Sequence, residues 1–222
     1  MIPSQVYVRV LQFSGEEAVT AGQGAAVLLQ FPDVQRLVTA RHLTNGEHDE
    51  YVNLRAPFIS DGKWFQLFLS RAGNIRADVD VALYDLPRPI IPPESYPLTY
   101  GFDDAVYTQD VFLLGHPYGL SLQLDPIQGL DLPLTKRGIL AGSKDTDQGH
   151  LVFVDSIANP GFSGGPAVFK IAGTEQWKCM GIIKGQYMQD APTSDGTPAS
   201  KMPAGITAVT TIDSALAKLG LI

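Results

Sequence analysis

The chain has 222 residues, a formal net charge of -7 and a single cysteine, Cys179. This length allows one large or two small domains with a substantial hydrophobic core. The acidic balance, with no cluster of Lys or Arg, excludes a nucleic-acid-binding surface, and one cysteine excludes an intrachain disulfide. No apolar run approaches the roughly 20 residues of a membrane-spanning helix, so we expect no membrane partner.

The first residues, Met-Ile-Pro-Ser-Gln-Val, lack the basic start and apolar run of a secretory signal. Together with the absence of a disulfide, this predicts a cytoplasmic protein, unless a leader segment has been removed. Cys179 lies in an apolar run, which favours a buried strand cysteine over a nucleophile.

Short runs rich in β-branched and aromatic residues dominate the first half of the chain, and each predicts a strand. The expected strands are residues 6–11, 25–31, 36–40, 51–54, 63–69 and 79–84. Residues 86–97 then contain five prolines in twelve positions. Because proline cannot donate to a strand ladder, this segment is expected to be an extended linker between two domains.

Strands resume after the linker, with two long polar or Pro/Gly-rich loops at residues 121–133 and 189–203. The expected strands are residues 110–114, 135–140, 151–154, 167–171, 180–183 and 205–209. The tail, residues 211–220, has a helical pattern that Thr211 or Asp213 could cap and Gly220 could end.

Two sets of about six strands, divided by a proline-rich linker, predict an all-β protein made of two six-stranded antiparallel β-barrels. We expect an N-terminal barrel in residues 1–86, a linker in 87–106, a second barrel in 107–210 and a C-terminal helix in 211–222. A single β-sandwich is the alternative, but the linker fits it less well.

Residues 159–166, Asn-Pro-Gly-Phe-Ser-Gly-Gly-Pro, form a run of turn-formers around one serine, Ser163. Such a loop buries little apolar surface, and its ordering costs conformational entropy. Its presence is better explained by the groups that it exposes, a serine hydroxyl and backbone N–H groups. A serine on a tight turn beside free backbone N–H groups is the arrangement of a nucleophile with an oxyanion hole. An ordinary glycine turn with an incidental serine is the alternative.

A serine nucleophile needs a general base, for which histidine is suited near neutral pH. The chain has four histidines, at His42, His48, His116 and His150. All precede Ser163, and helices are nearly absent, so the literal Gly-x-Ser-x-Gly spacing does not indicate an α/β-hydrolase. His42 is favoured because it follows an apolar strand. His48 lies in a polar loop that could instead bind metal, His116 in a turn and His150 at a strand entrance.

The third member of such a site is a buried acid that accepts a hydrogen bond from the histidine. Asp80 lies within the apolar run 77–83, where an unpaired charge is costly. By pattern alone Asp78 competes with it, and Asp80 could also face water on an edge strand.

These segments resemble those of a known family. Residues 39–42, Thr-Ala-Arg-His, resemble the Thr-Ala-x-His strand end of trypsin-like peptidases, residues 80–83 their Asp-Val/Ile-Ala-Leu segment, and residues 161–166 their Gly-x-Ser-Gly-Gly-Pro. Residues 114–120, 135–139 and 155–161 resemble motifs of the bacterial high-temperature-requirement (HtrA-type) proteases. The chain order His, Asp, Ser is that of the chymotrypsin fold.

This resemblance implies a role for each residue: Ser163 as nucleophile, His42 as general acid and base, and Asp80, in preference to Asp78, as the carboxylate that orients it. It implies an oxyanion hole formed by the N–H groups of Gly161 and Ser163, and a structural turn at His116. Neither a metal nor a cofactor is expected.

The resemblance also places Ile157, Ala158, Lys184 and Gly185 along the substrate. Ile157 would lie at the base of the primary specificity pocket, where relatives specific for Arg or Lys have Asp, so we expect an apolar residue before the scissile bond. Lys184 stands where relatives often have Ser or Thr; it could bind an acidic group or be a solvated strand end.

Phe162 departs from the pattern, since zymogen-type relatives carry Asp there and heat-stress relatives usually Asn. Activation by N-terminal cleavage is therefore not expected. No PDZ domain follows within this sequence, so peptide-triggered regulation of that type is not expected either.

The sequence thus predicts a serine endopeptidase that acts on polypeptides through an acyl-enzyme. A catalytically silent binding or scaffold module on the same fold is the alternative from another class, and an esterase is a third. Whether a regulatory protein partner opens the loops at residues 121–133 and 189–203 is left open.

Overall fold

A computed structural model describes residues 1–15, 24–44, 49–56, 63–91, 98–123, 131–190 and 201–222. His48 and large parts of the two long loops predicted at residues 121–133 and 189–203 lie outside the described residues. None of the helices in the described part of the chain has the length and apolar character that spanning a bilayer requires.

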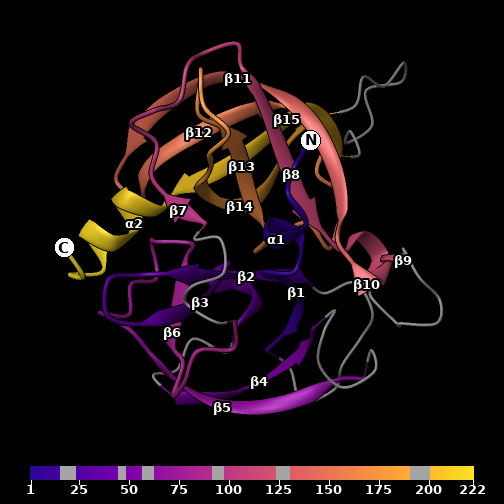
Figure 1. The fold of residues 1–222 in the computed structure, drawn as a ribbon. Helices are drawn as coiled ribbons and strands as arrows, with labels where there is room; N and C mark the ends of the chain where they lie inside the picture. Colours follow the sequence, from indigo (N-terminus) through magenta and orange to yellow (C-terminus); the bar gives the residue numbers. More distant parts are fainter. Residues whose placement is uncertain (16–23, 45–48, 57–62, 92–97, 124–130, 191–200) are drawn as a thin grey trace.

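The first half of the chain forms a closed antiparallel barrel with the strand order β1-β2-β3-β6-β5-β4 (Figure 1). Closure pairs every strand on both sides and leaves no free sheet edge. The strands are β1 Val10–Ser14, β2 Gly24–Gln30, β3 Gln35–Thr39, β4 Asp49–Arg55, β5 Phe65–Arg71 and β6 Ala82–Asp85.

The second half forms a sheet in the order β13-β8-β11-β12-β15-β14-β7, and β13 also pairs with β14, which closes six of these strands into a second barrel (Figure 1). The strands are β7 Thr99–Tyr100, β8 Asp110–Gly115, β11 Leu134–Thr146, β12 Gly149–Asp155, β13 Pro166–Lys170, β14 Trp177–Asp190 and β15 Lys201–Thr211. A small two-stranded sheet, β9 Leu122–Gln123 with β10 Asp131–Leu132, stands apart from it. The two-barrel fold expected from the sequence is confirmed.

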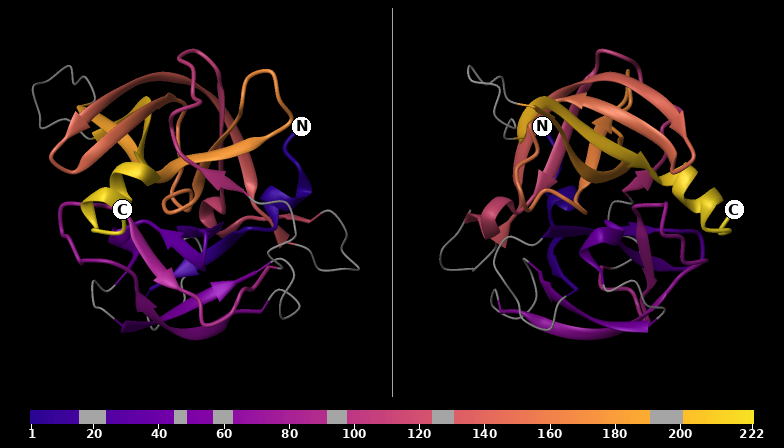
Figure 2. Two further views of the ribbon diagram at one scale, coloured as in Figure 1. Left: turned by 60° about the vertical axis from the view of Figure 1, so that its left-hand side comes forward. Right: turned by 180° about the vertical axis from the view of Figure 1, so that it is seen from behind.

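The buried apolar side chains of the described segments form three cores, one inside each barrel and one between the barrels. The core between the barrels combines residues of both, such as Val38 and Val168, with Ile212 and Leu216 of the C-terminal helix α2 (Ile212–Lys218). As Figure 2 shows, α2 lies beside the junction of the two barrels. Burial between the barrels therefore fixes the position of one relative to the other.

The N-terminus differs from the expectation. Instead of a strand at residues 6–11, a short helix α1 (Ser4–Tyr7) precedes β1, which begins at Val10. Ile2 and Val6, four residues apart, both reach the core between the barrels. Val6 is the buried residue of this helix, so the short helix, and not a strand, carries the side chain that packs between the barrels.

Two further expectations concern single segments. Part of the expected linker forms a strand, because Thr99 and Tyr100 of β7 pair in parallel with β14.

Cys179 is a buried strand residue, as predicted, and burial raises the pKa of its thiol to about 12. A thiol held protonated in this way is a poor nucleophile.

Candidate active site

His42 and Asp80 meet at one end of the first barrel. His42 lies on a 3-10 turn, η1 (Arg41–Leu43), that follows β3, and Asp80 lies two residues before β6. Because Thr39 of β3 pairs with Ala82 of β6 in an antiparallel register, the exit of one strand adjoins the entrance of the other. Strand register thus brings together two side chains that are 38 residues apart in the sequence.

The Asp80 carboxylate accepts from two N–H groups of His42, one of the ring and one of the backbone. Nδ1 of the ring lies 2.9 Å from Oδ2 and 3.1 Å from Oδ1, and the backbone N–H of His42 donates to Oδ1 over 3.0 Å. The carboxylate is 13% exposed and the imidazole 42%. Since an ionised carboxylate only accepts, we assign the ring proton to Nδ1, which leaves Nε2 as an acceptor facing the cleft.

Asp78, the competing carboxylate, is engaged elsewhere. It accepts hydrogen bonds of 3.0 and 2.7 Å from Arg76, and this hydrogen bonding holds the pKa of the Asp78 carboxyl below its usual range. Asp80, and not Asp78, is therefore the residue that orients the imidazole.

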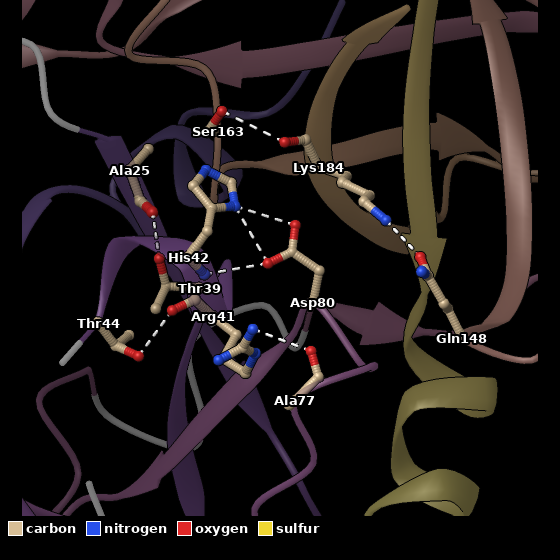
Figure 3. A network of polar contacts seen from close by, with 10 residues as sticks. All are labelled: Ala25, Thr39, Arg41, His42, Thr44, Ala77, Asp80, Gln148, Ser163 and Lys184. Carbon is tan, nitrogen blue, oxygen red and sulfur yellow. Dashed lines mark hydrogen bonds and ion pairs between the residues drawn. The ribbon is translucent and has the colours of Figure 1, made fainter. Parts of the chain in front are cut away.

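Ser163 comes from the second barrel, on the loop between β12 and β13. Figure 3 shows its hydroxyl beside the imidazole of His42, with the Asp80 carboxylate on another side of the ring. The hydroxyl donates to the carbonyl of Lys184 over 3.5 Å, and no hydrogen bond joins it to His42 among the residues drawn in Figure 3. The three side chains lie close together, with His42 and Asp80 lining one hollow and the serine hydroxyl beside the ring and turned toward β14.

The backbone around Ser163 is held at several points. The carbonyl of Pro160 accepts from the N–H of Tyr118 and that of Gly161 from the N–H of His116, both over 3.1 Å. The carbonyl of Ser163 accepts from the N–H of Ala25 over 2.8 Å, across the two barrels. The N–H groups of Gly161 and Ser163 donate to no acceptor in the part of the chain that the structure describes, as donors for a substrate oxygen would.

The orientation of the Gly161 N–H follows from these contacts. In a trans peptide the N–H points opposite to the carbonyl of the same unit. Because the Pro160 carbonyl points at Tyr118, the Gly161 N–H points away from the turn that carries Tyr118. Gly161 has a φ of +98°, and a Cβ added there would lie 2.3 Å from the carbonyl oxygen of His116, so only glycine fits.

Lys184 and Gly185 lie on β14, next to Ser163. The Lys184 ammonium donates to Oε1 of Gln148 over 2.6 Å (Figure 3), so the side chain is neither ion-paired within the described residues nor fully solvated. It lines a hollow of about 450 Å³ beside His42 and Asp80. Gly185 lines a second hollow, of about 360 Å³, that also reaches Lys184.

Ile157 and Ala158 lie on the loop that leads to Ser163. The Ile157 side chain is 43% exposed, whereas Ala158 is 4% exposed and its N–H donates to Oγ1 of Thr207 over 3.1 Å. Neither residue lines the two hollows that border Lys184. The predicted role of Ile157 at the base of a specificity pocket stays a prediction.

The family model of the trypsin-like peptidase domain matches residues 10–174, most of the chain. The chain belongs to the trypsin-like peptidase family. A comparison with curated protein sequences finds no match.

Solved structures of proteases share the fold of this peptidase. The Rv3671c protease from M. tuberculosis, active form, has 18% sequence identity and a TM-score of 0.59, over 98% of this chain and 83% of that one. The HtrA-type protease AlgW with tripeptide has 19% sequence identity and a TM-score of 0.60, over 96% of this chain and 60% of that one. The serine endoprotease from Yersinia pestis has 16% sequence identity and a TM-score of 0.61, over 97% of this chain and 62% of that one. The peptidase thus spans about six-tenths of the last two chains, and identities this low show the fold alone.

The other described histidines of the peptidase take no part in this cleft. His116 is buried within hydrogen-bonding distance of Gln12 and Ser121, at 3.5 and 3.3 Å. His150 pairs with Asp145 over 2.7 Å. In the described part of the chain no group of His, Cys, Asp and Glu side chains could hold a metal ion.

One residue beside the site was not singled out from the sequence. Lys136 of β11 contacts the loop that carries Ser163, through Ile157 and Asn159. A signal was present, since strand alternation places Lys136 on the same side of β11 as the buried Gly138 and Leu140. A lysine on the inward side of a strand needs hydrogen-bond acceptors or an opposite charge nearby, because burial of an unpaired charge is costly.

Proposed function

We propose that this peptidase is a serine endopeptidase that cleaves polypeptides through a Ser-His-Asp triad and an acyl-enzyme. The observation that carries the proposal is the orientation of the His42 ring by Asp80, with the Ser163 hydroxyl beside that ring. The N–H groups of Gly161 and Ser163 add to it, since neither has an acceptor within the described residues.

The chemistry follows from these atoms. The Ser163 oxygen attacks the substrate carbonyl carbon while Nε2 of His42 takes the hydroxyl proton, and Asp80 stabilises the resulting imidazolium. The Gly161 and Ser163 N–H groups stabilise the oxyanion; a single such donor is worth roughly 3–4 kcal/mol in other enzymes. His42 then protonates the leaving amine, and water, deprotonated by the same nitrogen, hydrolyses the ester on Ser163.

Before attack, the Ser163 hydroxyl must leave the Lys184 carbonyl and approach Nε2. The 3.5 Å distance to that carbonyl is at the limit of a hydrogen bond, so rotation about the Cα–Cβ bond of Ser163 costs little. Catalytic hydrogen bonds are often long or poorly aligned until substrate binds. The same geometry is what a silent binding module would retain, so turnover must be tested directly.

A fluorophosphonate probe is expected to label Ser163 in the folded protein, because its phosphorus is attacked by an activated serine and its oxygen occupies the oxyanion hole. Intact-mass and peptide mass spectrometry measure the adduct, and Ser163→Ala is the control that must lose it. An unlabelled Ser163 in folded protein would favour the binding module. Comparison of amide and simple ester hydrolysis separates a peptidase from an esterase.

A peptide library is expected to show cleavage after apolar residues, with Arg and Lys poorly accepted. The reason is Ile157, which offers no carboxylate to a basic side chain at the position that the family resemblance assigns to the pocket base. Sequencing of the cleaved products gives the profile. An Ile157→Asp variant supplies the matched comparison, since it should raise cleavage after Arg or Lys; a wild-type profile dominated by basic residues would overturn the assignment.

A further inference from the structure

Lys136 places a cation under the loop that carries Ser163. Its Nζ donates over 2.5 Å to the carbonyl of Ile157 and over 2.5 Å to Oδ1 of Asn159, and lies 5.7 Å from the centre of the Phe162 ring. No carboxylate pairs with it among the described residues. Two of its three N–H donors and its contact with an aromatic face are thus directed at this one loop.

The ammonium of Lys136 binds neutral oxygen atoms of this loop, unlike the ion-paired Lys170 and Lys178. Lys178, whose side chain is 12% exposed, pairs with Asp103 and Asp104, and the more exposed Lys170 pairs with Glu175. Lys136 is half-buried, and burial lowers the pKa of its ammonium. A lysine that only covers apolar surface keeps its charged end in water, whereas here the charged end contacts the loop.

These contacts include Phe162, the residue that departs from the family pattern. Its ring is fully buried in the core of the second barrel, and its N–H donates to the carbonyl of Asn159 over 3.1 Å. Lys136 therefore contacts the loop before Gly161, at Ile157 and Asn159, and after it, at Phe162. Between these two points, the backbone N–H groups of His116 and Tyr118 donate to the carbonyls of Gly161 and Pro160.

We propose that Lys136 is a positioning residue, whose ammonium holds residues 157–162 in the shape that directs the Gly161 and Ser163 N–H groups at the substrate. This rests on the proposed peptidase function. The loop needs such support because Gly161 has a left-handed φ and because the Pro160–Gly161 peptide unit could rotate once its neighbours move. Loss of the ammonium should then act on transition-state stabilisation more than on substrate binding.

Lys136→Met keeps the length of the side chain and removes the charge. We expect kcat to fall about 10- to 100-fold with KM changed less than about threefold, since a single oxyanion donor is worth about 100- to 1000-fold. Fluorophosphonate labelling of Ser163 should slow in parallel. Lys136→Arg should recover part of the rate, and Lys144→Met, on the exposed part of the same strand, should leave it unchanged.

Asn159→Ala tests the same contact from the loop and covers the case in which Lys136→Met folds poorly. If both act through one contact, the double variant should lose little more than the larger single loss. Two results would overturn the proposal. One is an unchanged kcat in folded Lys136→Met protein, with the enzyme concentration taken from the number of serines that the fluorophosphonate can label. The other is independent effects of the two substitutions.

Hydrogen exchange separates this inference from the proposed function, because it needs no turnover. Lys136→Met should speed exchange in the peptide that covers residues 157–163 and not in β1–β6. If the wild-type protein is never labelled at Ser163, the proposed peptidase function is wrong. Faster hydrogen exchange in Lys136→Met would still support the loop contact. Equal exchange in the two proteins would refute it.

Discussion

Replacement of Asp80 by Asn is expected to lower kcat by about 10⁴-fold while the protein stays folded. An amide NH₂ facing the ring would favour the tautomer with the proton on Nε2, which cannot then accept the Ser163 proton. The carboxylate accepts from both the ring Nδ1–H and the backbone N–H of His42, so the orientation of the ring depends on it. Peptide hydrolysis under single-turnover conditions, with the folded fraction checked by circular dichroism, measures the loss.

Asp78→Asn is the matched control, because the same chemical change is made two residues away. Asp78 is partly exposed and its hydrogen bonds go to Arg76, so hydrolysis should stay within about twofold of the wild type. If Asp78→Asn were as damaging as Asp80→Asn, the orientation of His42 would depend on the local charge of the segment and not on one carboxylate. If neither mattered, the triad assignment would be wrong.

His42 and Asp80 could be named from the sequence as candidate site residues because of the apolar segments that adjoin or contain them. His42 follows the apolar strand expected at residues 36–40, and Asp80 lies within the apolar run 77–83, where an unpaired charge is costly, so each was a candidate for the site. The choice between Asp80 and Asp78 required either the family resemblance or the observed strand register, since both acids lie in the same short segment. Period-2 alternation does not separate two acids that are two residues apart.

Other features depend on contacts between distant segments. The Ser163 hydroxyl points toward Lys184, a choice among rotamers that no local pattern specifies. The helix α1 stands where the local pattern predicts a strand, and its buried residue Val6 packs in the core between the barrels. Lys136 could have been noticed as a lysine in an inward register, but its partners on the serine loop become visible only when β11 and that loop are placed together.

Gly164→Ala is expected to destabilise the protein by about 4 kcal/mol or more, the range reached when a substitution clashes with a fixed backbone. Gly164 has a φ of +81°, and a Cβ there would lie 2.1 Å from the carbonyl oxygen of Ala25 and 2.4 Å from Oγ1 of Thr39. These two atoms are hydrogen-bonded to each other over 2.7 Å in the first barrel, so neither can move without loss of that bond.

Gly173→Ala separates this clash from the cost of the backbone conformation. Gly173 has a nearly equal φ of +73°, but nothing lies within 4 Å of its added Cβ. Its replacement should therefore cost only the about 1–2 kcal/mol of a left-handed residue with a side chain. Chemical denaturation of both variants measures the difference. Similar losses would mean that the serine loop can move away from the first barrel, in which case the contact between Ser163 and Ala25 would not be what holds the nucleophile in the cleft.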